Sequence, residues 1–418
     1  MSSLATLYQL TEIDTPRLII RPVKLGDEIE INAAIQRSLP ILQRWMPWAN
    51  DPSLESTQTF VRKAVASWQS QSAIEFPMVV IHKKINRIIA ATGFNDRSIP
   101  VMPFYEIGYW IDTNYQGQGF VTEYVNALTR YALDALLAQR VQIDTHIENQ
   151  KSMAVAKRCG FTKEFVMKNE RLECGNNLPA DSVLYACCDI NELPPLVVTW
   201  KHHAQESKSQ FIPAKQETSK SPIKLKPLET KRLKLLAPRD EDVTKVHNAL
   251  LASLNELSPW FSWAIEQKQT VEEVVRNINE DRIAANDIKA HTELFYFVWD
   301  KDENTFLGEV WLKILDWSVM SAYVGYWFDS RQTKKGYARE AVANVVQYAF
   351  DELNAKRISI DVSVDNEKSL KLPKALNFTS EGIMKNYYRN FVTNEITDAE
   401  RFAMTNINQI SLCLKADN

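Results

Sequence analysis

A glycine-rich run, Gln116-Gly117-Gln118-Gly119, follows an apolar segment that ends at Ile111 and precedes a segment with helical spacing. Glycine tolerates unusual backbone dihedrals, so successive N–H groups can converge on an anion at the positive end of a helix. The pattern predicts a loop that holds a pyrophosphate. A turn that merely joins a strand to a helix is the alternative interpretation.

Asn149 and Ser152 stand at the predicted start of another helix, which runs to about Arg158. Asn and Ser side chains satisfy the free N–H groups of a helix's first turn, so capping alone would explain both residues. Capping and ligand contact are compatible roles for such residues.

The glycine-rich segment occurs twice. Residues 109–123 and 326–340 share a Tyr-Trp start and a Glu end, at a constant offset of 217 positions (325 − 108). The constant offset indicates a duplication without insertions over about sixty residues. The second copy differs from the first at Thr333, Lys334 and Lys335, keeps Gly336, and has Pro373 inside its later helix. The lysines could neutralise phosphate or form a solvated pair, and Pro373 should remove a hydrogen bond and kink the helix.

A chain of 418 residues, of which 45% are apolar, is long enough for two packed cores. Between the copies lies a stretch rich in Lys, Ser, Gln and Pro, as expected of an exposed linker. We therefore expect an N-terminal domain over residues 1–200, a linker over 201–228 and a C-terminal domain over 229–418.

The composition also argues against several classes of partner. The formal charge of −3 gives no general attraction to nucleic acid or to an anionic membrane. The N-terminal segment lacks the pattern of a secretory signal, and no apolar run is long enough to span a membrane, so a cytoplasmic location is expected. The five cysteines and six histidines show no metal-ligand spacing, so no metal site is predicted.

Alternating or apolar runs predict strands, and three-to-four spacing predicts helices. Strands are expected at 18–20, 76–82, 88–95, 105–111, 141–146, near Phe165 and at 183–187, and helices at about 27–42, at 56–69, after Gly119 and at 150–158. An α+β fold follows, with helices on the faces of a sheet.

These motifs resemble the GNAT superfamily of acetyl-CoA-dependent N-acetyltransferases, most closely its RimJ/RimL branch, in both halves of the chain. The family's loop reads Gln/Arg-x-x-Gly-x-Gly/Ala, and Gln116, Gly119 and Val121 hold its fixed places, although Val is larger than Gly or Ala. Asn149-x-x-Ser152 is similar to the family's next motif. The resemblance implies two tandem GNAT domains, each a mixed, mostly antiparallel sheet with helices on both faces.

The resemblance also implies the chemistry, which is transfer of an acetyl group from the co-substrate acetyl-CoA to a primary amine. It implies that acetyl-CoA contacts Gln116, Gly117, Gln118, Gly119, Phe120, Val121, Asn149 and Ser152. In relatives the Asn contacts the pantetheine arm, and Ser152 is the candidate that protonates or hydrogen-bonds the departing thiolate. Many relatives use a Tyr further along this helix, where this chain has Ala156 and Pro373, so the general acid stays open.

Glu106 is the candidate base. An amine attacks a thioester only when it is neutral, so a side chain or a water relay must accept a proton. Glu106 lies on the strand that leads into the loop and shares a face with Gly108 and Trp110 by two-residue alternation. The alternative is a solvent-facing carboxylate. The segment Trp45-Met46-Pro47-Trp48 resembles the family's segment near the acceptor mouth, or it packs as part of the core or a lid.

The intact loop and the helix without proline favour the first copy as the working enzyme. The second copy could bind cofactor weakly, recognise a partner or act structurally, and the two domains could form an intramolecular pseudo-dimer. The expected acceptor is a protein or peptide N-terminus. A small amine is the alternative acceptor, and a non-catalytic acyl-CoA-binding or protein-interaction module is the alternative for the second copy.

Overall fold

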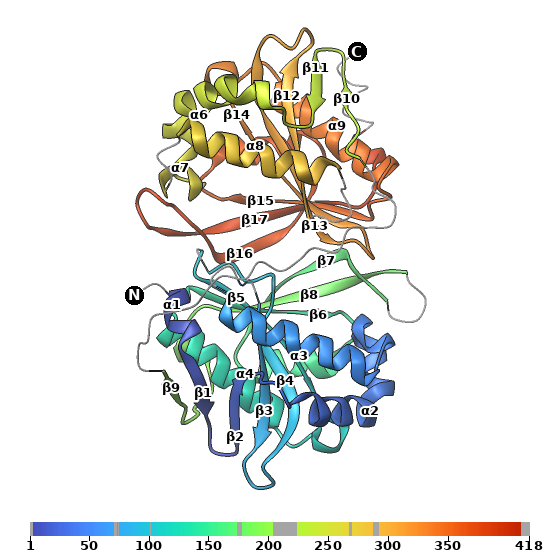
Figure 1. The fold of residues 1–418 in the computed structure, drawn as a ribbon, viewed down its shortest axis with the longest axis vertical. Coiled ribbons are helices and arrows are strands. Elements are labelled where there is room, and N and C mark those ends of the chain that lie inside the picture. The colour runs from blue at the N-terminus through green and yellow to red at the C-terminus, as the bar shows by residue number, and fades with distance from the viewer. Residues whose placement is uncertain are drawn as a thin grey trace. The chain divides into compact units, whose positions relative to one another are not determined.

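The computed structural model describes residues 3–70, 73, 75–100, 102–173, 178–203, 224–266, 270–286 and 292–410. The chain divides into two compact units, one built mainly from Met1–Met167 and Leu172–Pro213, the other mainly from Ala214–Met384 and Tyr388–Asn418 (Figure 1). Most of the predicted linker, residues 204–223, lies outside the described residues. No helix within the described ranges is long and apolar enough to cross a membrane.

The first unit is built on a nine-stranded sheet. Its order is β7 (Thr162–Leu172), β8 (Pro179–Cys187), β6 (Arg140–His146), β5 (Phe104–Ile111), β4 (Arg87–Phe94), β3 (Phe76–His82), β2 (Leu18–Pro22), β1 (Leu10–Asp14) and β9 (Thr199–His202). Its helices are α1 (Ser3–Tyr8), α2 (Glu28–Trp45), α3 (Leu54–Gln69), α4 (Phe120–Arg130) and α5 (Gln150–Arg158).

Helices cover both faces of this sheet because successive strand residues point to opposite sides. Val80 packs in one core with Leu128 of α4 and Val155 of α5. Its neighbour Val79 packs in a second core with residues of α2 and α3. The apolar stripe of α4 thus faces the sheet, as its three-to-four spacing predicted.

The sheet opens between β5 and β6. These parallel strands pair only from Phe104–Glu106 to Arg140–Gln142, whereas β5 pairs with β4 over Ile107–Ile111. Beyond Glu106, one side of β5 therefore has no strand partner within the described chain. Buried backbone N–H and C=O groups need hydrogen-bond partners. The unpaired side of β5 therefore suits a ligand that can hydrogen-bond to it.

The second unit repeats this plan. Its eight-stranded sheet has the order β10 (Leu228–Glu229), β11 (Leu233–Leu236), β12 (Glu293–Asp300), β13 (Phe306–Asp316), β14 (Ser321–Phe328), β15 (Arg357–Ser363), β17 (Ile396–Met404) and β16 (Thr379–Arg389). Its helices are α6 (Val243–Leu257), α7 (Trp263–Glu266), α8 (Val271–Asn286), α9 (Tyr337–Asp351) and α10 (Glu367–Ala375). The parallel pair β14 and β15 is the counterpart of β5 and β6.

The predicted α+β architecture of two domains, each a mostly antiparallel sheet with helices on both faces, is confirmed. Helix α10 continues past Pro373 and has the same nine-residue length as α5. Proline cannot donate to the carbonyl of Ser369, four residues earlier, but that carbonyl still accepts a hydrogen bond from the Tyr326 hydroxyl at 3.3 Å. The first copy has the same contact, from the Tyr109 hydroxyl to the carbonyl of Ser152 at 3.3 Å, so it belongs to both domains and is independent of the proline.

Candidate active site

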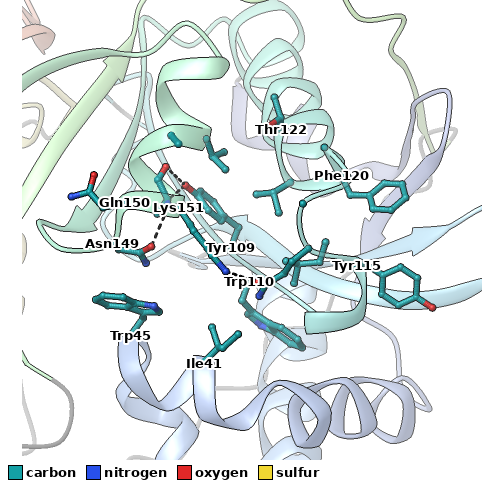
Figure 2. Close-up of a pocket in the computed structure, with 18 of the residues that line it drawn as sticks. Ile41, Trp45, Tyr109, Trp110, Tyr115, Phe120, Thr122, Asn149, Gln150 and Lys151 are labelled. Carbon is teal, nitrogen blue, oxygen red and sulfur yellow. Dashed lines mark hydrogen bonds between the residues drawn. The ribbon is translucent and has the colours of Figure 1, made fainter.

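A cavity of about 860 Å³ lies in the first unit where β5 and β6 separate. Residues from β5, from the start of α4, from α5 and from α2 line it. Figure 2 shows Trp45 and Ile41 of α2 on one side of the cavity, and Phe120 and Thr122 of α4 on the other. Tyr109 and Trp110 point to opposite faces of the sheet, yet both line the cavity, so it passes through the open sheet.

The glycine-rich loop forms one end of this cavity. Gly117 and Gly119 adopt φ values of 74° and 80°, a region that L side chains rarely occupy, and Gly119 precedes the first turn of α4. The free N–H groups of that turn therefore face the cavity at the positive end of the helix. Gln116, Gly117, Gly119, Phe120 and Val121 all line the cavity.

Gln118 is the predicted loop residue that the structure places outside the lining. Its backbone carbonyl accepts a hydrogen bond from Arg17 Nη1 at 2.9 Å, and its side-chain nitrogen donates to the carbonyl of Asn114. Arg17 also pairs with the largely buried Glu123 of α4. Gln118 thus fixes the shape of the loop, and this clamp explains why the repeated segment ends in a glutamate in both copies, which is Glu123 in the first copy.

Two cations that the sequence did not single out line the cavity close to the loop. Lys151 Nζ donates to Gln116 Oε1 at 3.0 Å, and Arg158 Nε donates to Thr122 Oγ1 at 3.3 Å. Both come from α5, so only the packing of α5 beside α4 brings them to the loop. They add positive charge where the loop presents N–H groups, which suits an anionic ligand.

Asn149 and Ser152 lie together at the start of α5 and line the cavity. Asn149 Oδ1 accepts a hydrogen bond from the Ser152 N–H at 3.1 Å, so the capping role is real. The Ser152 hydroxyl lies 2.7 Å from the hydroxyl of Tyr109. Burial raises the pKa of Tyr109 above its usual value, so the phenol keeps its proton at neutral pH and can donate it.

Tyr109 was missed as a site residue by the sequence interpretation, which looked for a tyrosine on the helix that begins at Asn149. The structure supplies a phenol from β5 instead. Its retention as Tyr326 in the second copy was the available signal.

The backbone of Tyr109 also faces the cavity side of the strand. Asp112 N–H donates to Ile89 O and Asn95 N–H donates to Glu106 O, so even-numbered residues of β5 turn their backbone groups toward β4. By alternation, the N–H groups of Tyr109 and Ile111 face the open side. A carbonyl oxygen bound there would find a donor in place.

Glu106 lies outside this lining. Its side chain is buried on the Trp110 face, where Oε1 accepts from Asn95 Nδ2 at 2.7 Å and Oε2 accepts from Gln142 Nε2 at 2.5 Å. Burial raises the pKa of Glu106, and Arg97 partly opposes that rise. A raised pKa suits a base, but its position requires a relay to reach the cavity.

The two tryptophans of the 45–48 segment have different positions relative to the cavity. Trp45 lines the cavity and packs against His146 at 5.3 Å between ring centroids. Trp48 lies over Trp110 at 6.0 Å and is 45% exposed. The segment thus packs on the α2 side of the cavity and also leaves aromatic surface exposed there.

The second unit keeps the loop backbone but changes its side chains. Gly336 has φ of 79°, and Lys334 adopts a φ of 64° at the place of Gly117. Tyr326 Oη lies 3.5 Å from Ser369 Oγ, a longer contact than its counterpart, and burial raises the pKa of Tyr326 to about 12. Ala375 stands where the first copy has Arg158.

Comparison with known proteins agrees with this geometry. The acetyltransferase (GNAT) domain matches residues 17–162 and again residues 232–379. The chain is 27% identical over 172 residues to the ribosomal-protein-serine acetyltransferase of Escherichia coli (strain K12), an alignment that covers 39% of this chain and 94% of that protein. It is 26% identical over 170 residues to the spermidine N(1)-acetyltransferase of Vibrio cholerae serotype O1, an alignment that covers 41% of this chain and 91% of that protein.

The chain is also similar to a solved structure of Mycobacterium smegmatis RimJ in complex with CoA-disulfide, at 21% sequence identity and a TM-score of 0.40. That alignment covers 47% of this chain and 95% of the RimJ chain. The two domain matches together span most of the chain and include the loop, Tyr109 and Ser152 with their counterparts. The chain belongs to the acetyltransferase (GNAT) family as a tandem of two RimJ/RimL-like domains, and it is an N-acetyltransferase with acetyl-CoA as co-substrate.

Proposed function

We propose that the first domain transfers the acetyl group of acetyl-CoA to the α-amine of a protein or peptide N-terminus. The observation that carries this proposal is the cavity that passes through the open sheet, lined by Tyr109 on one face and Trp110 on the other. A thioester held on the α4 and α5 side could meet an amine that approaches from the α2 side. The proposal includes domain boundaries at 1–200, 201–228 and 229–418, and a cytoplasmic location.

The loop and α5 would hold the co-substrate, which supplies the thioester-bound acetyl group. Gln116, Gly117, Gly119, Phe120 and Val121 would surround the pyrophosphate, whose charge suits the N–H groups at the start of α4. Gln118 would act through its backbone carbonyl on Arg17.

Lys151 and Arg158 would neutralise further phosphate charge, and Asn149 would meet the pantetheine arm with its amide nitrogen. Both basic side chains already line the cavity, so this role requires no rearrangement of α5. These assignments fit the donors that the cavity presents.

Tyr109 and Ser152 would serve the departing thiolate. When the carbon–sulfur bond breaks, the sulfur gains an electron pair and needs a proton. The Tyr109 hydroxyl keeps its proton because burial raises its pKa, and it lies 2.7 Å from Ser152 Oγ. Either hydroxyl can donate to sulfur while the other replaces the proton, so we propose the pair as the general acid.

Glu106 remains the proposed base, acting through a relay. The attacking nitrogen loses a proton, which must leave on the Trp110 face if the amine approaches from α2. Glu106 lies on that face with a raised pKa, and its carboxylate contacts Gln142 and Asn95. Water between the amine and this cluster would complete the path.

His146 is a poorer choice of base in this structure. Its Nδ1 accepts a hydrogen bond from the Glu148 N–H at 3.0 Å, so a neutral ring carries its proton on Nε2. That tautomer presents a donor rather than an acceptor on its remaining nitrogen.

An α-amine is the acceptor that needs least help from the base, because its pKa is about 8 whereas that of Lys is about 10.4. The similarity to the Escherichia coli ribosomal-protein-serine acetyltransferase supports the same choice. The second candidate acceptor is a small amine, favoured by the similarity to the Vibrio cholerae spermidine N(1)-acetyltransferase.

The test is a thiol-release assay on the full chain with acetyl-CoA. Matched peptides with free and blocked N-termini form one panel, and small polyamines form another. We expect release with free N-termini and none with blocked ones. Release with polyamines alone would select the second acceptor. Absence of release with every acceptor, despite acetyl-CoA binding, would reject a catalytic first domain.

A further inference from the structure

The second unit contains a different cavity, of about 610 Å³, between helices α6 and α8 and strands β12 to β14. It lies on the face of the sheet opposite α9, since Phe297 lines it while the neighbouring Val298 packs in the core with α9. Nothing in the acetyl-transfer chemistry above uses this space.

Aromatic rings form the walls of this second cavity. Trp263, Trp311, Trp327 and Phe295 all line it. Phe295 stacks with Trp311 at 6.4 Å between centroids and an interplanar angle of 29°, and Trp263 lies 6.4 Å from Trp327. Such faces carry negative electrostatic potential, which attracts cations.

Carboxylates reach into the same cavity. Glu309 Oε2 accepts a hydrogen bond from Trp327 Nε1 at 2.8 Å. Asp281 lines the cavity and makes no hydrogen bond or ion pair with any residue that the structure describes. Burial raises the pKa of Asp281 to about 8, with Glu309 the next cause, and burial likewise raises the pKa of Glu309 to about 7. Carboxylates with perturbed pKa values that line a cavity are candidates for a functional site.

The strand register shows what stands at the same places in the first unit. Trp327 of β14 pairs with Glu309, whereas its counterpart Trp110 of β5 pairs with Ala91. At this position of the sheet, the second unit has the carboxylate of Glu309 where the first unit has the methyl group of Ala91.

The next pair along the strands differs as well. Gly325 pairs with Trp311, and a Cβ on Gly325 would lie only 2.2 Å from Trp311 Cζ2. Its counterpart Gly108 pairs with Gly93. The absence of a side chain at Gly325 makes room for the tryptophan that walls the cavity.

The helix that covers this face differs in the same direction. Helices α3 and α8 each have 16 residues, and Ala64 and Asp281 occupy the same place in them. Ala64 is buried in an apolar core with Val61 and Val79. At the place of Asp281 the first unit therefore has a small apolar side chain within a packed core.

We propose that this cavity of the second domain binds an organic ammonium ion, with Asp281 and Glu309 as the anionic partners and the tryptophans as the walls. An ammonium group would donate to the carboxylates, and its alkyl body would lie on the indole faces. This is a binding site, and no group is transferred there.

The test is calorimetric titration of the full chain with two ammonium probes, 1,4-diaminobutane and tetramethylammonium, at up to about 10 mM. The primary amine can donate to carboxylates, whereas the quaternary ion relies on the aromatic faces, so the two probes separate the contributions. We expect saturable 1:1 binding of at least one probe. 1-Butanol, which has a similar body and no charge, should not bind.

Asp281→Asn and Glu309→Gln preserve side-chain shape and should each weaken binding about 10- to 100-fold, the usual effect of losing a charged hydrogen-bond partner. Asp351→Asn, an exposed position on α9, removes the same charge elsewhere in the domain and should leave affinity unchanged. Circular dichroism checks that each variant is folded.

Failure of both probes to bind the wild-type chain would overturn the proposal, as would undiminished binding in folded Asp281→Asn and Glu309→Gln. Acetyl transfer does not enter this readout. A negative result here therefore leaves the proposed function of the first domain standing, and a loss of acetyl transfer would not remove this site.

Discussion

Gly119 of the first domain and Gly336 of the second have nearly the same φ, 80° and 79°, and each precedes the helix that follows its loop. Arg17 Nη1 and Arg232 Nη1 donate at 2.9 Å to the carbonyls of Gln118 and Lys335. The loop backbone and its arginine clamp are therefore the same in both copies, although the side chains around them have diverged.

Lys334 shows how strongly the fold imposes that backbone. It adopts φ of 64° where the first copy has Gly117 at 74°. A left-handed conformation costs a lysine roughly 1–2 kcal/mol. The second domain retains this strained turn without the Gln116 and Arg158 partners, so conservation of loop shape is not by itself evidence of equal ligand binding.

The largest expected difference between the domains is in acetyl-CoA affinity. Gly119→Glu should weaken binding about 100-fold or more, because it adds a side chain and a negative charge where the loop would hold pyrophosphate. Gly336→Glu imposes the same backbone strain and serves as the matched control. We expect it to leave the tight site intact, as measured by calorimetry. The opposite pattern would assign the tight site to the second domain.

Glu106→Gln should give the next largest effect, a fall in turnover of roughly 100-fold with acetyl-CoA affinity nearly unchanged. The loss should be greatest on the acid side of the amine pKa of about 8, where most of the acceptor is charged. Tyr323→Phe changes the equivalent place in the second domain and should have little effect. A full rate for Glu106→Gln from about pH 6 to 9 would show that this carboxylate is not the base.

Tyr109→Phe should lower kcat about tenfold, since a hydrogen bond to a charged group contributes roughly 1.5–3 kcal/mol and Ser152 can still donate. KM for acetyl-CoA should change little. Tyr326→Phe is the matched variant. Because the hydroxyl of Tyr326 makes a longer contact with Ser369, this variant should leave kcat unchanged. Equal losses in both variants, measured by steady-state kinetics, would mean that both domains turn over.

The smallest effect concerns stability. Because the folded pKa of Asp281 is about 8, above the unfolded value of about 4, the unfolding free energy of this domain should fall as pH rises through that window. Asp281→Asn removes this proton linkage, so Tm should rise near pH 8 and change little near pH 4.

Three carboxylates face Asp281 in this linkage: Glu280 on its own helix, Glu293 on β12 and Glu309 on β13, of which Glu293 pairs with Lys313. The matched reverse change, Ala64→Asp, should destabilise the first domain over the same window. Differential scanning calorimetry distinguishes the cases. An unchanged Tm for Asp281→Asn at high pH would show that the group is already ionised without cost.

The sequence by itself determined the duplication, the α+β plan and the position of the loop. Each depends on signals in the sequence itself, namely a constant offset, two periodicities and glycines before a helix. These signals can be recognised without knowing how the elements pack. The cap at Asn149 is of the same kind, because its partner Ser152 lies three residues away.

Only the tertiary structure decided which distant side chains meet. Tyr109 and Ser152 come from a strand and a helix and lie 43 residues apart in the sequence. Glu106 is buried where Gln142 of β6 and Asn95, which follows β4, donate to its carboxylate. Asp281 and Glu309 line one cavity because α8 packs on β12, which pairs with β13 in a given register. Local propensity fixes only the element that each residue occupies, whereas sheet register and helix packing fix where its side chain lies. The chemistry depends on the positions of the side chains, so only the tertiary structure determines it.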